Sequence, residues 1–179
     1  MTIQETAIPL AYFITFTCYG TWLHGAKSTS VDCSTNTPGT LFLSFNPQRL
    51  HFVKKRMSEN AYILDKRNRD IVLRAIEEVC IYREWVLLAA HVRSNHIHLV
   101  VHARTQPEHI MSTIKSYASR HLNQAKLDNN RTNRWTHHGS TQYLWKEAEI
   151  EATIQYVVYE QGLPMAVFEN KDRSFLVLC

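Results

Sequence analysis

The chain has 179 residues, of which 45% are hydrophobic and 11% aromatic, so it is long enough to form one domain with an apolar core. Its formal net charge of +4 permits binding to nucleic acids without requiring it. No apolar run approaches the roughly 20 residues needed to cross a bilayer, and the first residues lack the basic start of a signal peptide. We therefore expect a cytoplasmic protein without membrane segments.

The first half of the chain predicts one strand and two helices. Aromatic and β-branched residues predict a strand over residues 10–18. A polar loop follows over 26–40, and the mixed segment 48–62 is expected to be helical. Apolar residues recur at helical spacing over 68–83, which predicts a longer helix.

The second half begins with two apolar segments, 85–92 and 96–102, which predict a pair of strands joined as a hairpin. Residues 105–125 predict a helix whose first residues match a capping box with a proline in the first turn. A last strand is expected over 141–145 and a final helix over 148–161.

With the segment 48–62 left aside, the first six elements follow the order strand, helix, strand, strand, helix, strand. This is the split βαβ pattern of an α+β fold, in which an antiparallel, ferredoxin-like sheet carries its helices on one face. The final helix is additional to that pattern. Because no linker or repeat interrupts the chain, we expect residues 1–179 to form a single domain.

Two histidines, His96 and His98, stand at i and i+2 at the start of a predicted strand. Alternation along the strand places both side chains on one face, where two imidazoles can hold one divalent metal ion. The alternative is a pair of surface histidines on an edge strand.

A tyrosine on the final helix suggests what such a metal could serve. The apolar residues of that helix predict a buried stripe that leaves Tyr156 to one side, with Glu160 one turn further along. Attack of the tyrosine oxygen on a DNA phosphodiester would use all these groups, with Glu160 as an oxygen ligand that suits Mg²⁺ or Mn²⁺. The alternative for Tyr156 is an ordinary, partly buried tyrosine.

These residues also resemble a known family. Residues 95–101 resemble the His-hydrophobic-His (HUH) motif of the single-tyrosine transposases that mobilise bacterial insertion sequences as single-stranded DNA, and of their REP-associated relatives. Blocks 19–23, 138–145 and 156–162 resemble the same family in the same order. The resemblance covers roughly residues 11–165, which we take as the core of the domain.

The resemblance implies the HUH endonuclease fold and a transposase that nicks and rejoins single strands through a 5′-phosphotyrosine link. It assigns metal binding to His96 and His98 and the nucleophile to Tyr156, with Tyr159 as a rival. The third ligand of the family is often Gln or Asn four residues after the tyrosine. Glu160 occupies that position here and Gln161 follows, and helical geometry favours Glu160 because Gln161 would return to the apolar stripe.

The resemblance further implies single-stranded DNA as the partner, with hairpin-forming element ends. Such binding needs phosphate neutralisation and base stacking. Candidate contacts are the basic residues Lys54, Lys55, Arg56, Lys115, Arg120, Arg131 and Arg134, with Trp22 and Trp135 as stacking platforms. A homodimer is a further option, and nothing in the sequence decides whether the tyrosine serves its own histidines or a partner's.

Other functions fit less well. A histidine-triad hydrolase needs a third histidine where Val100 stands, and an amidohydrolase barrel needs about 250 residues. A two-histidine phosphoesterase needs a second copy of its motif. The remaining alternative is a hairpin- or single-stranded DNA-binding relative that no longer cuts, against which the intact histidines and tyrosine argue.

Overall fold

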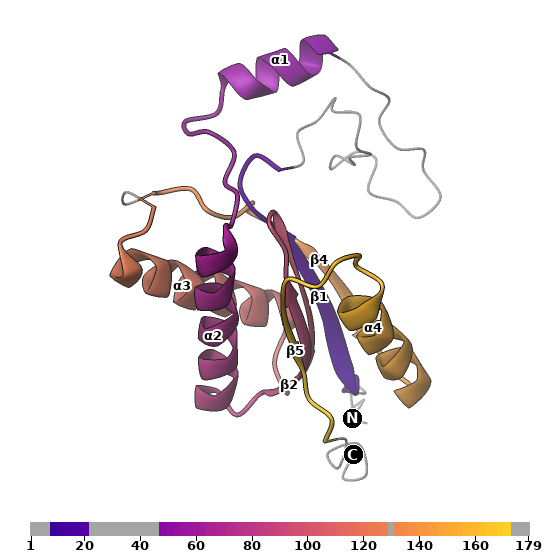
Figure 1. Cartoon of the computed structure of the whole chain (residues 1–179). Helices are drawn as coiled ribbons and strands as arrows, with labels where there is room; N and C mark the ends of the chain where they lie inside the picture. The colour runs from indigo at the N-terminus through magenta and orange to yellow at the C-terminus, as the bar shows by residue number, and fades with distance from the viewer. Residues whose placement is uncertain (1–7, 22–46, 129–130, 173–179) are drawn as a thin grey trace, which may run out of the picture.

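The computed structural model describes residues 8–21, 47–128 and 131–172, so the predicted loop over 26–40 lies outside the described residues. Its centre is a five-stranded antiparallel sheet in the order β4-β1-β3-β2-β5 (Figure 1). The strands are β1 (Ala11–Thr17), β2 (Val86–Val92), β3 (His96–His102), β4 (Ser140–Leu144) and β5 (Ala166–Glu169). The order of the first four strands is the one that the split βαβ pattern predicts.

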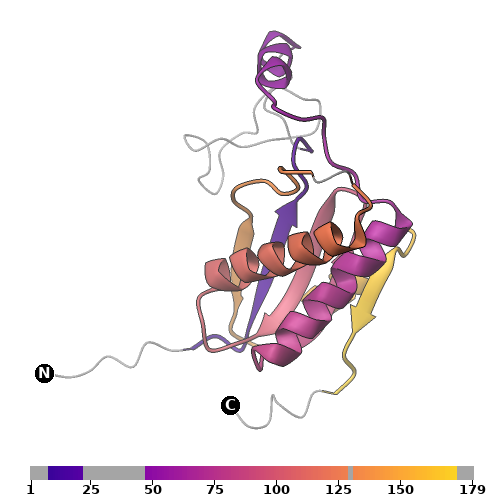
Figure 2. The ribbon, with the colours of Figure 1, turned by 90° about the vertical axis from the view of Figure 1, so that its left-hand side faces the viewer.

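Helices cover both faces of this sheet. α2 (Lys66–Tyr82) and α3 (Pro107–Ala125) lie side by side on one face (Figure 2), and α4 (Glu147–Tyr159) packs on the other (Figure 1). α1 (Pro47–Lys55) stands apart from the sheet. The predicted fold is confirmed: α+β, with two helices on one face and an additional helix near the C-terminus.

Strand alternation divides the buried side chains into two clusters. Ile14 and Phe16 of β1 point toward α2 and α3, while Ile154 and Val157 of α4 pack on the opposite face. Each cluster consists of buried apolar side chains. Their burial stabilises the packing of the helices on that face of the sheet.

One element was missed in the sequence, and one local expectation was wrong. β5 was not predicted, because a strand of four residues carries little periodic signal and is specified by pairing with β2. The capping box predicted at the start of α3 is also absent, since the N-cap Gln106 makes no side-chain cap bond. Glu108 instead accepts a hydrogen bond from the Thr141 hydroxyl at 3.2 Å, which joins α3 to β4.

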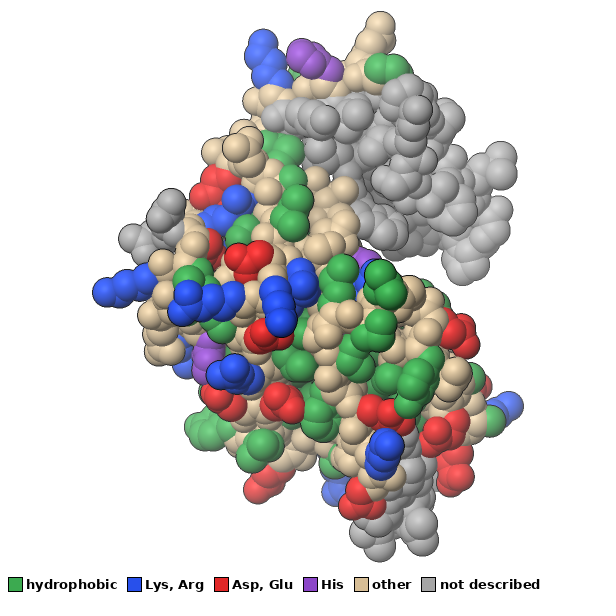
Figure 3. Space-filling model, in the orientation of Figure 1, with side chains coloured by type: hydrophobic (Ala, Val, Ile, Leu, Met, Phe, Trp, Pro, Cys, Tyr) green, Lys and Arg blue, Asp and Glu red, His purple; other side chains and the backbone are tan. Residues whose placement is uncertain are grey.

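Charged side chains of both signs lie on the surface. Figure 3 shows Lys and Arg side chains interspersed with Asp and Glu side chains over α2, and further Asp and Glu side chains around α4. Within the described residues, none of the helices combines the length and the apolarity that a membrane-crossing helix needs.

Candidate active site

His96 and His98 lie on the side of β3 that faces α4, with ring centroids 4.8 Å apart. They are paired in register with Thr17 and Thr15 of β1, respectively. Because β3 is a central strand, its backbone is held on both sides by neighbouring strands. The two imidazoles are therefore presented from a rigid part of the sheet, as the i, i+2 spacing predicts.

Hydrogen bonds orient both rings. His96 Nδ1 donates to Asn95 Oδ1 at 2.8 Å, and His98 Nδ1 lies 2.7 Å from Thr15 Oγ1. An amide oxygen can only accept, so Nδ1 of His96 carries the proton and Nε2 keeps its lone pair. With Nδ1 engaged in each ring, Nε2 is the nitrogen available to a metal ion.

The environment keeps these imidazoles neutral. Burial lowers the pKa of His98 to about 4, with a further contribution from the neighbouring His96. Burial, followed by the charge of Arg93, also lowers the pKa of His96. Metal binding requires the neutral ring, so both histidines are prepared for it at neutral pH.

The third residue beside the histidines is Gln161, not the expected Glu160. The Gln161 side chain hydrogen-bonds to both imidazoles, which offsets part of the lowering of their pKa values by burial, and its Nε2 donates to the Tyr156 carbonyl at 3.3 Å. Glu160 is exposed, and the described residues contain no group of three His, Cys, Asp or Glu that could hold a metal.

The backbone explains this correction. α4 ends at Tyr159, and Glu160 is its C-cap with φ −104° and ψ 9°. The predicted helix 148–161 was therefore wrong at its end, because the chain leaves the helix before it reaches Gln161.

Tyr156 lies beside the histidine pair on α4. Its ring centroid is 5.8 Å from that of His98 and 6.1 Å from that of Phe13, which stacks on His98. The side chain is 40% exposed, so it is accessible from solvent. The rival Tyr159 donates its hydroxyl to Glu169 of β5 at 2.7 Å, and this bond raises its pKa.

A third histidine, missed in the sequence, fixes α4 in place. His91 of β2 is fully buried; its Nδ1 donates to the Val157 carbonyl at 2.8 Å, and the Met165 N–H donates to its Nε2 at 3.2 Å. It is the register partner of His98, so it faces the same side of the sheet. Alternation within the apolar run 85–92 was the signal that could have identified it.

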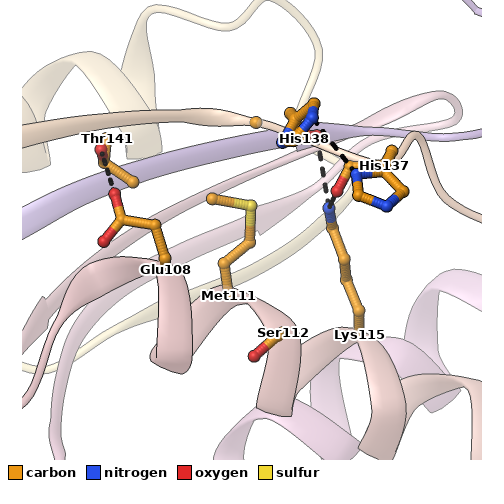
Figure 4. Close-up of a pocket in the computed structure, with 8 residues that line it drawn as sticks. Glu108, Met111, Ser112, Lys115, His137, His138 and Thr141 are labelled. Atoms are coloured by element: carbon orange, nitrogen blue, oxygen red, sulfur yellow. Dashed lines mark hydrogen bonds between the residues drawn. The ribbon is translucent and has the colours of Figure 1, made fainter.

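The predicted DNA contact Lys115 lies away from this site. It lines a cavity of about 360 Å³ between α3 and the segment before β4 (Figure 4). Its Nζ donates to the carbonyls of Thr136 (2.9 Å), His138 (3.3 Å) and His137 (3.4 Å), and burial lowers its pKa to about 8. Lys115 therefore fastens this segment to α3, on the sheet face opposite the histidine pair.

Two other predicted DNA contacts, Arg134 and Trp135, use their polar groups inside the protein. Arg134 is 3% exposed and donates to both carboxylate oxygens of Asp128 at 2.7 Å. Trp135 donates from Nε1 to Ser119 Oγ at 2.9 Å and packs edge-on against Phe16. Both side chains tie the segment before β4 to α3 and the core.

The remaining predicted contacts lie at or near the surface. Lys55, Arg56 and Arg120 are exposed, while half-buried Arg131 lies over the Tyr62 ring. Trp22 and the side chain of Lys54 lie outside the described residues. None of the predicted basic or aromatic contacts in the described part of the chain joins the histidines and Tyr156.

A ferredoxin-like sheet that carries a His-hydrophobic-His pair on a central strand is an HUH endonuclease fold. A family model described as "Transposase IS200 like" matches residues 45–159, which is more than half of the chain. The chain therefore belongs to the IS200-like transposase family, whose members bind DNA, cleave and rejoin it, and thereby move genetic elements.

Solved structures with similar folds include two transposase-related proteins. One is a REP-associated tyrosine transposase bound to a REP hairpin; the identity is 11%, the TM-score 0.47, and the match covers 89% of this chain and 72% of that one. The other is a candidate transposase from Deinococcus radiodurans, with 14% identity, a TM-score of 0.42 and coverage of 90% and 97%. Both TM-scores are below 0.5, so the family assignment rests on the sequence match. The comparison with curated proteins returned no match.

Proposed function

We propose that the protein nicks and rejoins single-stranded DNA with Tyr156 as nucleophile and with a divalent cation held by His96, His98 and Gln161. The observation that carries this proposal is the position of the Tyr156 ring, 5.8 Å from that of His98, on an exposed part of α4. We infer that the nucleophile and the ligands act within one chain.

The donor set fits Mg²⁺ or Mn²⁺. The donor atoms are Nε2 of His96, Nε2 of His98 and the amide oxygen of Gln161. Both ions accept an amide oxygen as a ligand. Imidazole nitrogen is bound more readily by the transition metal, so Mn²⁺ is the better match. A cation held there supplies charge neutralisation at the scissile phosphate.

The chemistry of the chain's own residues is a transesterification. Tyr156 Oη forms a bond to the phosphorus of the phosphodiester while the bond from phosphorus to the 3′-oxygen breaks. The tyrosine proton leaves to solvent, and the departing 3′-oxygen takes up a proton, which leaves a 3′-OH and a 5′-phosphotyrosine. Attack of a 3′-OH on that link reverses these steps and rejoins a strand.

We infer that the DNA is a hairpin-forming end of a mobile element, as the family resemblance implies. Exposed Lys55, Arg56 and Arg120 remain as candidates for phosphate contacts. The second candidate function is binding of such DNA without cutting.

Labelled single-stranded oligonucleotides that tile the DNA on both sides of the coding sequence would test the proposal. Each would be incubated with the wild-type protein, Tyr156→Phe or Tyr159→Phe in Mg²⁺ or Mn²⁺, and the products separated under denaturing conditions. We expect a covalent protein–DNA band with the wild type and Tyr159→Phe, and none with Tyr156→Phe or with chelator. A band that survives in Tyr156→Phe and disappears in Tyr159→Phe would refute the assignment, and tight binding without any covalent band would support the binding-only function.

A further inference from the structure

The geometry points to Arg93 as a catalytic residue that contacts the scissile phosphate and stabilises the negative charge of the transition state. This inference rests on the function proposed above. It concerns a residue outside the HUH motif and outside the blocks that carry the family resemblance.

Arg93 lies where two segments of the site meet. It follows β2 directly, and its backbone N–H donates to the His96 carbonyl at 2.9 Å, which closes the turn into β3. Its Nη1 donates to the Leu163 carbonyl at 2.8 Å, two residues after Gln161. Gly162 lies beside the other end of the guanidinium, since a Cβ added there would lie 4.0 Å from Nη2.

These two hydrogen bonds bring the charge of Arg93 near the histidine pair, because one joins its backbone to His96 and the other joins its guanidinium to the segment that follows Gln161. None of the ion pairs between described residues includes Arg93, whereas Arg134 is paired with Asp128. Arg93 thus places a positive charge near the proposed cation site, and no carboxylate of the described residues pairs with it.

Such an arrangement is unfavourable until an anion binds between the two positive charges. A phosphodiester meets this requirement, and the free N–H groups of a guanidinium match its non-bridging oxygens. Those oxygens gain negative charge when Tyr156 attacks, so the interaction is stronger in the transition state than in the bound substrate.

The test compares two changes that separate charge from hydrogen bonding. Arg93→Gln removes the charge and keeps a polar N–H donor, and Arg93→Lys keeps the charge. Each variant would react with the oligonucleotide that forms the adduct with wild type, and with the same oligonucleotide carrying a neutral methylphosphonate at the scissile linkage. The rate of adduct formation and the unfolding temperature would be measured for each variant.

We expect Arg93→Gln to slow adduct formation about 100-fold or more on the phosphodiester, the effect of removing one transition-state donor. The methylphosphonate lacks the negative charge that Arg93 would contact, so on this substrate we expect Arg93→Gln to lower the rate of adduct formation by about fivefold or less. On the phosphodiester, the rate of Arg93→Lys should lie between those of Arg93→Gln and wild type. The matched control Arg74→Gln, on the exposed side of α2, should react as wild type.

Two results would overturn the inference while leaving the proposed function intact. One is Arg93→Gln reacting like wild type, and the other is an equal loss on both substrates, which would indicate a structural role through Leu163. If Arg93→Gln does not fold, Arg93→Lys decides: a defect equal on both substrates overturns the inference, and one that shrinks on the methylphosphonate supports it. If the wild type forms no adduct with any oligonucleotide, the proposed function fails and this inference fails with it.

Discussion

Which of two adjacent residues meets the histidines depends on the backbone of Glu160. With its φ at −104° and ψ at 9°, Glu160 ends the helix and its own side chain remains in solvent. The next side chain, Gln161, then turns back toward His96 and His98. A neutral amide thus occupies the position for which a carboxylate was expected, which leaves the site without a negative charge from this segment.

Replacing each of these residues tests which one binds the cation. We expect Gln161→Ala to raise the Mn²⁺ concentration needed for half-maximal adduct formation at least about tenfold, because it removes an oxygen ligand. The matched variant Glu160→Ala should stay within about twofold of wild type. If Glu160→Ala raised the required Mn²⁺ concentration more than Gln161→Ala did, Glu160 would be the ligand.

Protonation of His98 links its burial to stability. Its pKa is lowered from 6.5 to about 4 in the folded protein, first by burial. Between these values the unfolded chain binds a proton that the folded chain excludes, so this contribution to stability is complete above about pH 6.5. It is lost as the pH falls toward 4, at up to about 1.4 kcal/mol per pH unit.

Urea denaturation of the wild type, with chelator present, should therefore show a free energy of unfolding that falls as the pH is lowered from 7 to 5. His98→Leu should reduce the slope of the free energy of unfolding against pH by an amount that corresponds to about one bound proton. His51 is an exposed histidine on α1, and His51→Gln should leave the slope unchanged. Parallel pH profiles for wild type and His98→Leu would show that the pKa of His98 is not lowered.

At the scale of elements, α4 is fastened at both ends. Near its start, Glu149 accepts hydrogen bonds from the N–H groups of Trp145 (2.8 Å) and Lys146 (3.3 Å), which closes the turn from β4. Near its end, buried His91 holds the Val157 carbonyl and the Met165 N–H. These contacts fix the rotation of the helix, and with it the place of its tyrosine beside β3.

The pairing of β5 with β2 adds a second restraint on the same helix. Ala166 pairs with Val92 and Val167 with His91, so the chain returns to the sheet soon after α4 ends. The segment that contains Gln161 is therefore short and held on both sides, which pre-organises it beside the histidines.

At the scale of the whole molecule, α4 connects the two edges of one sheet. Only Trp145 and Lys146 separate β4 from α4, and β5 lies at the opposite edge. Exchange of α4 and β5 with another copy would require β5 to separate from β2 and the two-residue connection from β4 to extend. We therefore expect each chain to use its own tyrosine, in a monomer or in a homodimer.

Mixing two inactive variants tests this expectation. Equal amounts of Tyr156→Phe and the double variant His96→Ala/His98→Ala should form no covalent adduct above that of either alone, because neither chain has a complete site. Each variant mixed separately with wild type should leave the wild-type adduct in place. Restored activity in the first mixture would show that the tyrosine acts on the histidines of a partner chain.

Local rules were enough to derive much of this protein from its sequence. Strand alternation placed His96 and His98 on one face, and helical periodicity left Tyr156 beside the apolar stripe, because both depend on residues only a few positions apart. The order of the elements indicated the sheet topology, and the motif blocks indicated the family that the sequence match then showed.

Contacts between distant segments decided the rest. The pairing that specifies β5, the burial of Arg134 against Asp128 and the use of Lys115 by the segment before β4 all depend on the packed structure. The same holds for Gln161, whose place beside the histidines follows from where α4 ends and β5 begins. Sequence patterns describe one element at a time, whereas these positions are set by the joint packing of several elements, so only the tertiary structure could show them.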